Sequence, residues 1–247
     1  MLRRTFRFFF PRLQHPLLDA PLDLSPLDRE NEGRYRLAMT DDERADTFTA
    51  ARFAEGVRWR QVMRVFATPP ASVLDIGAGN GAIELAFTSA AYRVISVETE
   101  WNETAHRLGM RRVIASATAL PFRDARFDIV LLLETIEHLA EPLRASAEIA
   151  RVVRSGGVAL ITTPPRWRYA LRPDPHFGIR FLTLLAPAMQ RRVAARRGFG
   201  EPHHFVDRIY SSTAQIAKMI APLRIERVLS RSRLPQRWFW DAIVARR

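Results

Sequence analysis

One stretch of nine residues constrains the fold of this chain most strongly: Val73-Leu74-Asp75-Ile76-Gly77-Ala78-Gly79-Asn80-Gly81. Residues that favour β-strands precede the carboxylate of Asp75. Every second residue from Gly77 to Gly81 is then a glycine. An apolar run from Ala82 to Ala90 follows at once, which predicts a buried strand, a tight turn and the start of a helix. Because glycine lacks a Cβ atom, it suits a backbone that bends sharply and lets a ligand come close. The sequence therefore predicts a ligand-binding loop where this strand ends.

Two kinds of cofactor are compatible with the loop. Gly77-x-Gly79-x-x-Ala82 fits a relaxed dinucleotide fingerprint, and Glu98 lies about 20 residues further on, where that fingerprint places an acid. Asp75 argues for the other kind, because a carboxylate two residues before the first glycine would crowd a pyrophosphate. The same carboxylate suits a cofactor that carries an ammonium and a sulfonium. The loop alone leaves both possibilities open.

Segments of strand and helix character alternate beyond the loop, which predicts a mostly parallel sheet in an α/β protein. Four further strands are expected at 93–97, 113–115, 126–133 and 158–163, and two helices at 101–109 and 141–153. The strand at 126–133 is too apolar to have a solvated face. A helix at 41–66, with acids in its first turn, precedes the first strand and ends at Pro69-Pro70.

Composition narrows the functional classes. The chain has no cysteine, which excludes disulfides, thiolate metal sites and cysteine nucleophiles. No apolar run reaches the roughly 18 residues of a membrane span, and Met1 to Arg12 lacks a signal-peptide core, so a cytoplasmic location is expected. The net charge of +12 comes entirely from residues 165–247, which hold 17 basic residues and 5 acids. This asymmetry indicates an anionic substrate, a membrane surface or RNA as a partner, or simply a solvated arginine face.

The expected organisation is an N-terminal extension at 1–36 and one domain at 37–247. Alternating phenylalanines and arginines near the N-terminus could lie at an anionic lipid surface, or the extension could pack on the domain. Residues 164–205 interrupt the domain with a basic, aromatic and proline-containing insertion. Four apolar residues are expected to pack this insertion as a lid rather than form a contact surface: Phe181, Leu184, Leu185 and Met189.

Six motifs in order resemble class I S-adenosylmethionine (SAM) methyltransferases, particularly the branch with small-molecule and lipid substrates, over about residues 70–165. They are the glycine loop, Glu98, Ala119-Leu120-Pro121-Phe122, Phe127-Asp128-Ile129-Val130, Glu134-Thr135-Ile136-Glu137-His138-Leu139 and Arg151-Val152-Val153-Arg154-Ser155-Gly156-Gly157. The resemblance implies a Rossmann-like, seven-stranded, mostly parallel sheet with helices on both faces and a C-terminal antiparallel hairpin. Residues 224–229 and 238–245 are the candidates for that hairpin.

The resemblance also implies the residues that bind SAM. Asp75, Gly77, Gly79 and Gly81 would shape the pocket for its methionine half, and Glu98 would hold the ribose hydroxyls. Ser116, Ala117 and Thr118 would flank the adenine, and Glu134 would lie beside the transferable methyl. The family usually has aspartate at the position of Ser116, and a hydroxyl accepts a hydrogen bond from the adenine amine less strongly than a carboxylate.

Since SAM carries an activated methyl group, the protein mainly has to align a nucleophile, and a base helps if that nucleophile is a hydroxyl. Glu137 and His138 are the catalytic candidates. On a helix that begins at Glu134, these two residues would share a face with it. His138 suits a general base because the reference pKa of histidine lies near neutrality. The alternative for His138 is a capping or packing role.

The same Glu-x-x-Glu-His triplet resembles that of ubiquinone-biosynthesis O-methyltransferases and of small-RNA 2′-O-methyltransferases. It could hold a divalent metal, and His203-His204 falls where the RNA enzymes add a further histidine. The expected function is methyl transfer to a hydroxyl of a small-molecule, glycan or lipid-linked acceptor, without a metal. A metal-assisted RNA 2′-O-methyltransferase and a SAM-binding protein without turnover are the alternatives. Peripheral membrane contact through the N-terminus or the insertion is a further expectation.

Overall fold

The computed structural model describes residues 41–100, 112–170, 173, 178–198, 210–230, 235–238 and 240–247. For residues 41–48 and 187 only the backbone is described. Three sequence predictions lie outside these ranges: the extension at 1–36, the helix at 101–109 and the histidine pair His203-His204.

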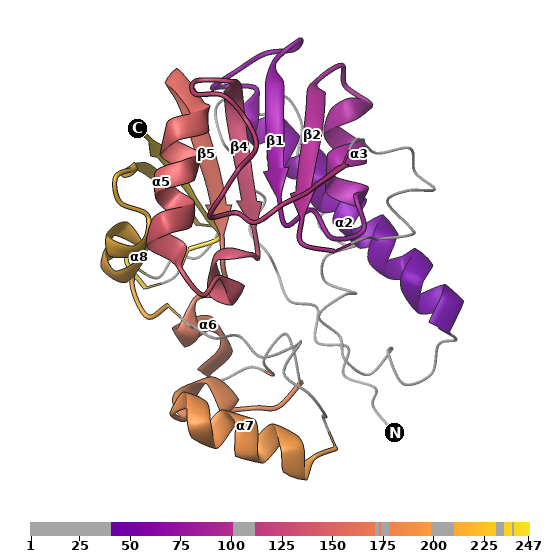
Figure 1. The fold of residues 1–247 in the computed structure, drawn as a ribbon. Coiled ribbons are helices and arrows are strands. Elements are labelled where there is room, and N and C mark those ends of the chain that lie inside the picture. The colour runs from indigo at the N-terminus through magenta and orange to yellow at the C-terminus, as the bar shows by residue number, and fades with distance from the viewer. Residues whose placement is uncertain are drawn as a thin grey trace.

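Seven strands form one sheet, in the order β3-β2-β1-β4-β5-β7-β6 (Figure 1). They are β1 (Ser72–Ile76), β2 (Arg93–Glu98), β3 (Arg112–Ile114), β4 (Phe127–Leu133), β5 (Val153–Thr162), β6 (Arg224–Leu229) and β7 (Ala242–Arg246). The first five strands pair in parallel, and β7 lies antiparallel to both β5 and β6. The predicted Rossmann-like sheet with a C-terminal antiparallel pair is confirmed.

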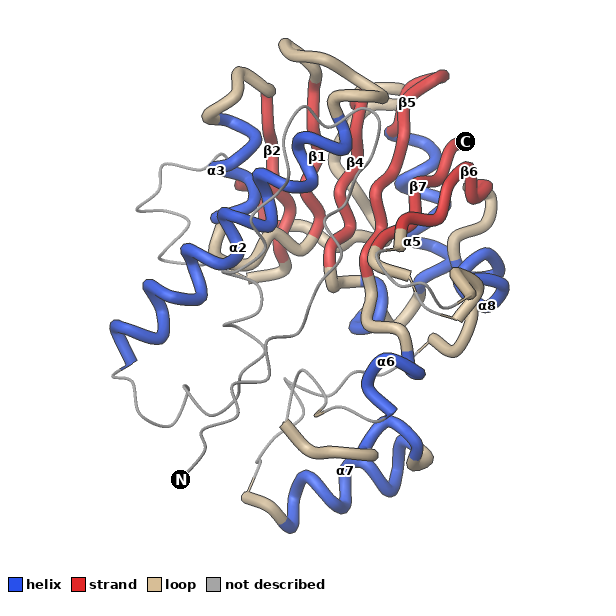
Figure 2. Tube along the Cα trace, turned by 180° about the vertical axis from the view of Figure 1, so that it is seen from behind, coloured by secondary structure: helices blue, strands red, loops and turns tan. Residues whose placement is uncertain are grey.

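Helices cover both faces of the sheet. α2 (Asp41–Met63) and α3 (Ala82–Thr88) lie on one face, which Figure 2 shows from the front. α5 (Pro142–Val152) and α8 (Thr213–Met219) lie on the other face, toward the viewer in Figure 1. The sequence analysis did not predict α8, which is a short helix whose N-terminus is capped by the Ser212 side chain.

β4 contributes to the hydrophobic core on both sides of the sheet. Ile129, Leu131 and Leu133 pack into the core under α2 and α3, whereas Val130 and Leu132 pack under α5 and α8. Side chains alternate between the faces of a strand, so a central strand with helices on both faces must be apolar throughout. This explains why the sequence of β4 shows no polar alternation.

Two strand boundaries differ from the predictions by four residues or more, those at the start of β5 and of β7. The expected turn at 154–157 lies within β5, where the pairing with β4 shifts between Phe127 and Ile129 and Gly156 has φ +76°. The glycines therefore form a bulge in a continuous strand. The last strand begins at Ala242 rather than at residue 238, because Pro235 to Trp238 form a turn. Trp240 is completely buried, and its indole N–H donates to the carbonyl of Thr163.

The insertion forms a small lobe beyond β5, which we call the cover lobe and define as the described residues between 166 and 198 (Figure 1). It contains α6 (Arg166–Ala170), the 3-10 turn η2 (Leu182–Leu184) and α7 (Pro187–Arg196). No helix among the described residues is long and apolar enough to cross a membrane.

The expectation of an apolar packed lid is wrong for three of its four residues. Phe181, Leu184 and Met189 are exposed by 53%, 44% and 51%, and only Leu185 is half-buried. The reason is that α7 has little to pack against. Of its described side chains only Ala194 is buried, and its packing partner is the short η2 turn.

Candidate cofactor-binding and active site

The strands place Asp75, Ser96 and Arg112 side by side in one row across β1, β2 and β3. Residues paired in this way on parallel strands point to the same face of the sheet. The Asp75 side chain is 2% exposed, and its Oδ2 atom has no hydrogen-bond partner among the described residues. Burial, and secondarily the charge of Glu84, raise the pKa of Asp75 to about 8. A buried carboxyl of this kind is neutral at pH 7 until a positive partner arrives.

The three glycines of the loop have left-handed φ angles, but they meet different surroundings. A Cβ atom on Gly77 would lie 2.7 Å from Cγ2 of Thr135, so Gly77 allows the loop to pack tightly against the end of β4. A Cβ atom on Gly79 would meet nothing within 4 Å. Gly77 is thus required by packing within the protein, whereas the Gly79 backbone borders open space, as a cradle for a ligand requires.

Charged side chains from β2 and β3 hold the peptide groups of Gly79. The Gly79 N–H donates to Oε1 of Glu98 at 2.5 Å, and Arg112 Nη2 donates to the Gly79 carbonyl at 2.9 Å. The Nε and Nη1 atoms of Arg112 are buried, and they have no hydrogen-bond acceptor in the described part of the chain. Glu98 therefore lies beside the glycine loop, where the sequence analysis expected it. Arg112 is a neighbour that the motifs did not indicate.

The residues expected to flank the adenine lie at the start of the loop between β3 and β4. Ser116 Oγ and Thr118 Oγ1 are 2.8 Å apart, and the Thr118 N–H donates to Ser116 Oγ, so the two side chains stabilise a local turn. Ala117 is buried, whereas Ser116 is exposed.

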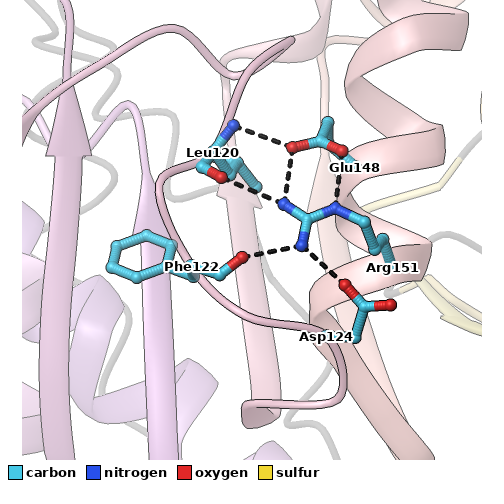
Figure 3. A network of polar contacts seen from close by, with 5 residues as sticks. All are labelled: Leu120, Phe122, Asp124, Glu148 and Arg151. Carbon is cyan, nitrogen blue, oxygen red and sulfur yellow. Dashed lines mark hydrogen bonds and ion pairs between the residues drawn. The ribbon is translucent and has the colours of Figure 1, made fainter.

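Arg151 of α5 anchors the next part of this loop (Figure 3). Its guanidinium donates to the carbonyls of Leu120 and Phe122, and it pairs with Asp124 and Glu148 at 2.7–2.8 Å. Glu148 in turn accepts a hydrogen bond from the Leu120 N–H. Hydrogen bonds from Arg151 lower the pKa of Glu148. One arginine thus fixes the path of the chain just after Ser116, Ala117 and Thr118.

Glu134 and Glu137 form an acidic pair where β4 ends. Glu134 has φ +51°, and its N–H donates to the carbonyl and to the hydroxyl of Thr162 on β5. The Glu134 side chain is exposed, yet desolvation by the protein atoms around it, and secondarily the charge of Glu55, raise its pKa to about 7. Glu137 is completely buried, and its burial and the nearby Glu134 charge raise its pKa well above the ordinary value.

The helical face expected for Glu134, Glu137 and His138 does not form. The helix is a single 3-10 turn, η1 (Ile136–His138), and Glu134 precedes it. Glu137 is buried whereas His138 is exposed, so these consecutive side chains lie in different environments. The cause is the left-handed backbone of Glu134, which turns the chain before the helix can begin. No three Asp, Glu or His side chains of the described residues are grouped to hold a metal ion.

Two charged residues of α2, Arg52 and Glu55, were not predicted from the sequence to belong to the site. Arg52 pairs with Glu55 at 2.5 Å, and the Arg52 charge lowers the pKa values of both Asp75 and Glu134 against the larger effect of their burial. Glu55 is 6% exposed and accepts a hydrogen bond from the Trp59 indole. The helix was predicted from the acids of its first turn and its apolar positions, and neither Arg52 nor Glu55 was considered. The signal in the sequence was the presence of Arg52 and Glu55 among the apolar residues of the helix. A charge that becomes buried there needs a partner, so the two residues could have been predicted to pair.

The residues at this edge of the sheet fit SAM. Asp75 offers a buried oxygen without a partner to a positively charged group, and the Gly79 backbone leaves open space beside it. Glu98 presents a carboxylate to a ribose diol. By contrast, a pyrophosphate would meet the carboxyl groups of Glu84 and Glu98 at the loop and would offer no positive charge to offset the cost of ionising Asp75. The dinucleotide alternative is therefore disfavoured by charge.

Comparisons with known proteins agree with this geometry. Residues 74–161 match the family model described as a methyltransferase domain. An uncharacterized methyltransferase of Mycobacterium sp. (strain KMS) is 34% identical over 140 residues, which cover 55% of this chain and 52% of that protein. One of Mycolicibacterium gilvum is 36% identical over 139 residues, covering 52% and 53%. The chain thus spans about half the length of the curated relatives it matches.

Solved structures share the fold. The 1,6-didemethyltoxoflavin-N1-methyltransferase of Burkholderia thailandensis, solved with its substrate and S-adenosylhomocysteine (SAH), is 18% identical with a TM-score of 0.54, covering 93% of this chain and 92% of that one. A Pyrococcus horikoshii protein has a TM-score of 0.55 at 16% identity, covering 84% and 92%. Together, the match over residues 74–161, the sheet order and the loop geometry support a class I SAM-dependent methyltransferase domain in this chain.

Proposed function

We propose that the protein transfers the methyl group of SAM to a hydroxyl of a small-molecule, glycan or lipid-linked acceptor. We choose a hydroxyl acceptor because of the acidic pair, Glu134 and Glu137, at the end of β4. A hydroxyl has to lose its proton during methyl transfer, and a carboxylate whose pKa lies near 7 is a suitable acceptor for that proton.

Each end of the cofactor has candidate partners in this proposal. Asp75 and the glycine loop would hold the positively charged methionine half, and Glu98 would hold the ribose. Ser116, Ala117 and Thr118 would flank the adenine. SAM itself supplies the activated methyl group, so the chain has to orient the acceptor and exclude water.

The proton acceptor would be Glu134, with Glu137 behind it. Glu134 is exposed, so an acceptor could reach it, whereas Glu137 is buried and its pKa is raised by its burial and by the nearby Glu134 charge. Exposed His138 is the second candidate. Separate substitutions of Glu134 and His138 distinguish them.

Methyl transfer from labelled SAM into fractionated cell extract tests the proposal with the full chain. We expect SAH to form together with a labelled product, and mass spectrometry to locate the methyl group on oxygen. A methylated nitrogen or carbon would overturn the hydroxyl assignment. Tight SAM binding without any product would favour a binding protein, and label in RNA that a chelator abolishes would favour the metal-assisted RNA enzyme.

A further inference from the structure

The cover lobe exposes a group of large apolar side chains. Phe181, Leu184 and Met189 are each about half exposed, and they lie on η2, α7 and the residue just before η2. Each side chain loses the favourable transfer free energy of its apolar surface while it stays in water. Exposed apolar residues that gather on one small lobe mark an interaction surface more often than scattered ones do.

Phe181 is also held in an unfavourable backbone conformation. Its φ is +64°, a left-handed value that a bulky side chain rarely adopts, and its carbonyl accepts the first hydrogen bond of η2 from the Leu184 N–H. Strain of this kind is found most often at functional sites. Here the strained residue presents an aromatic ring to solvent instead of packing it.

The same segment is strongly basic. Between Gly178 and Gly198 the sequence has five arginines and no acidic residue. The arginines are Arg180, Arg191, Arg192, Arg196 and Arg197, and all of them are exposed. An uninterrupted positive charge beside apolar side chains is the composition of segments that lie in the interface of an anionic bilayer.

We propose that the cover lobe docks on the surface of an anionic lipid membrane. Phe181, Leu184 and Met189 would enter the headgroup region, and the arginines around them would contact lipid phosphates. Of the four exposed large apolar side chains of the lobe, which include Trp167, two are aliphatic (Leu184 and Met189) and cannot stack with bases, which favours lipid over single-stranded RNA. The lobe lies beyond the C-terminal ends of β4 and β5 (Figures 1 and 2), and Glu134 directly follows β4 in the chain. Docking would therefore place the acidic pair near the membrane.

Sedimentation with lipid vesicles tests this proposal on the full chain. Vesicles of equal parts phosphatidylglycerol and phosphatidylcholine should bind the protein, whereas vesicles of phosphatidylcholine alone should bind it weakly. The combined variant Arg192→Glu/Arg196→Glu should bind the anionic vesicles at least about tenfold more weakly, because each basic residue near such a surface contributes to binding. Raising the salt concentration should release the unsubstituted protein.

Phe181→Gly separates docking from folding. Glycine adopts the left-handed conformation without strain, so the variant should unfold at the same temperature as the original chain or higher, yet bind anionic vesicles several-fold more weakly. Arg93→Glu and Val65→Ser are the matched controls. Both are exposed, and both lie at the opposite end of the sheet, so neither should change vesicle binding.

Three results would overturn the proposal. Equal binding to neutral and anionic vesicles would show that the arginines of the lobe do not contribute to membrane binding. Unchanged binding in the Arg192→Glu/Arg196→Glu and Phe181→Gly variants would assign the membrane contact to another part of the chain. Binding of RNA that persists in Phe181→Gly, with no binding of vesicles, would identify the lobe as a nucleic-acid surface. None of these outcomes depends on which acceptor the enzyme methylates.

Discussion

The Glu98 carboxylate accepts a 2.5 Å hydrogen bond from the backbone N–H of Gly79, across the ends of β2 and β1. We expect Glu98 to bind the ribose of the cofactor and the glycine loop to surround its methionine half. The hydrogen bond therefore joins two parts of the expected cofactor site. A charge-assisted hydrogen bond of this length restricts both groups. Glu98 is therefore orientated before the cofactor arrives.

Glu98→Gln should weaken SAM and SAH binding by about tenfold to a hundredfold, because an amide replaces the ionised acceptor of the ribose hydroxyls. Calorimetry on the purified chain measures both affinities. Glu141→Gln is the matched control, since Glu141 is exposed and its ion-pair partner among the described residues is exposed Arg144. Unchanged affinity in Glu98→Gln would show that the ribose lies elsewhere.

Asp75 should make cofactor binding release a proton. Its pKa of about 8 leaves it protonated at pH 7, and a bound positive charge would favour the ionised form. Titrations of SAM in buffers with different ionisation enthalpies should show proton release for the original chain and none for Asp75→Asn. An equal release in both proteins would assign that proton to another group.

The raised pKa of Asp75 also fixes the sign of a stability effect. Its folded pKa lies above the ordinary value of 3.8, so the cofactor-free protein loses stability as the pH rises from about 4 to about 8. Asp75→Asn, which cannot ionise, should unfold at a higher temperature at pH 7 and show a smaller loss across this range. Thermal unfolding at several pH values measures the difference.

Gly77→Ala should mainly lower the stability of the protein, whereas Gly79→Ala should mainly weaken SAM binding. The new Cβ of Gly77→Ala would press on Thr135, which should cost about 1–3 kcal/mol of stability in addition to the strain of a left-handed alanine. Thr135→Ala in the same chain should recover part of that loss. Gly79→Ala meets no neighbour, so it should cost only about 1 kcal/mol, yet weaken SAM binding. Equal stability losses would contradict this distinction.

Methyl transfer should depend on the ionisation of Glu134. Its pKa of about 7 predicts that kcat rises as the pH passes through 7 and then levels off. Glu134→Gln should lower kcat by about a hundredfold or more and remove this rise, whereas His138→Ala should keep it. If His138→Ala removed the rise and Glu134→Gln kept it, the proton acceptor would be His138.

Arg151→Ala should loosen the loop that carries Ser116, Ala117 and Thr118. It removes the donor to two loop carbonyls and leaves Glu148 without its partner, so we expect about 1–3 kcal/mol lower stability and weaker SAM binding. The pKa of Glu148 is lowered, so this stabilisation is present above its ordinary value of 4.5 and disappears at more acidic pH. Arg144→Ala on the same helix is the control, because Arg144 pairs with Glu141 in an exposed ion pair within the described part of the chain.

The elements that carry strong local signals were predicted closely. Residues 224–229 form β6 as expected, and β2 and β4 differ from their predicted ranges by one residue at one end. An apolar run between turn residues is enough to predict a buried strand. A strand that is buried on both faces has to be apolar along its whole length. The bulge at Gly156 could not be predicted, since two glycines suit a turn and a bulge equally well.

By itself, the sequence determined the individual strands, the glycine loop and the position of Glu98 at the end of β2, because these depend on residues close together in the chain and on a repeating apolar pattern, whereas the seven-stranded sheet was predicted from the resemblance. Only the tertiary structure decided that Arg52 of α2 lies near Asp75 and Glu134, and that Glu137 is buried beside exposed His138. It also decided that Phe181 and Met189 are exposed rather than packed. Burial and the distances between charges depend on residues far apart in the chain, and a local pattern does not contain them.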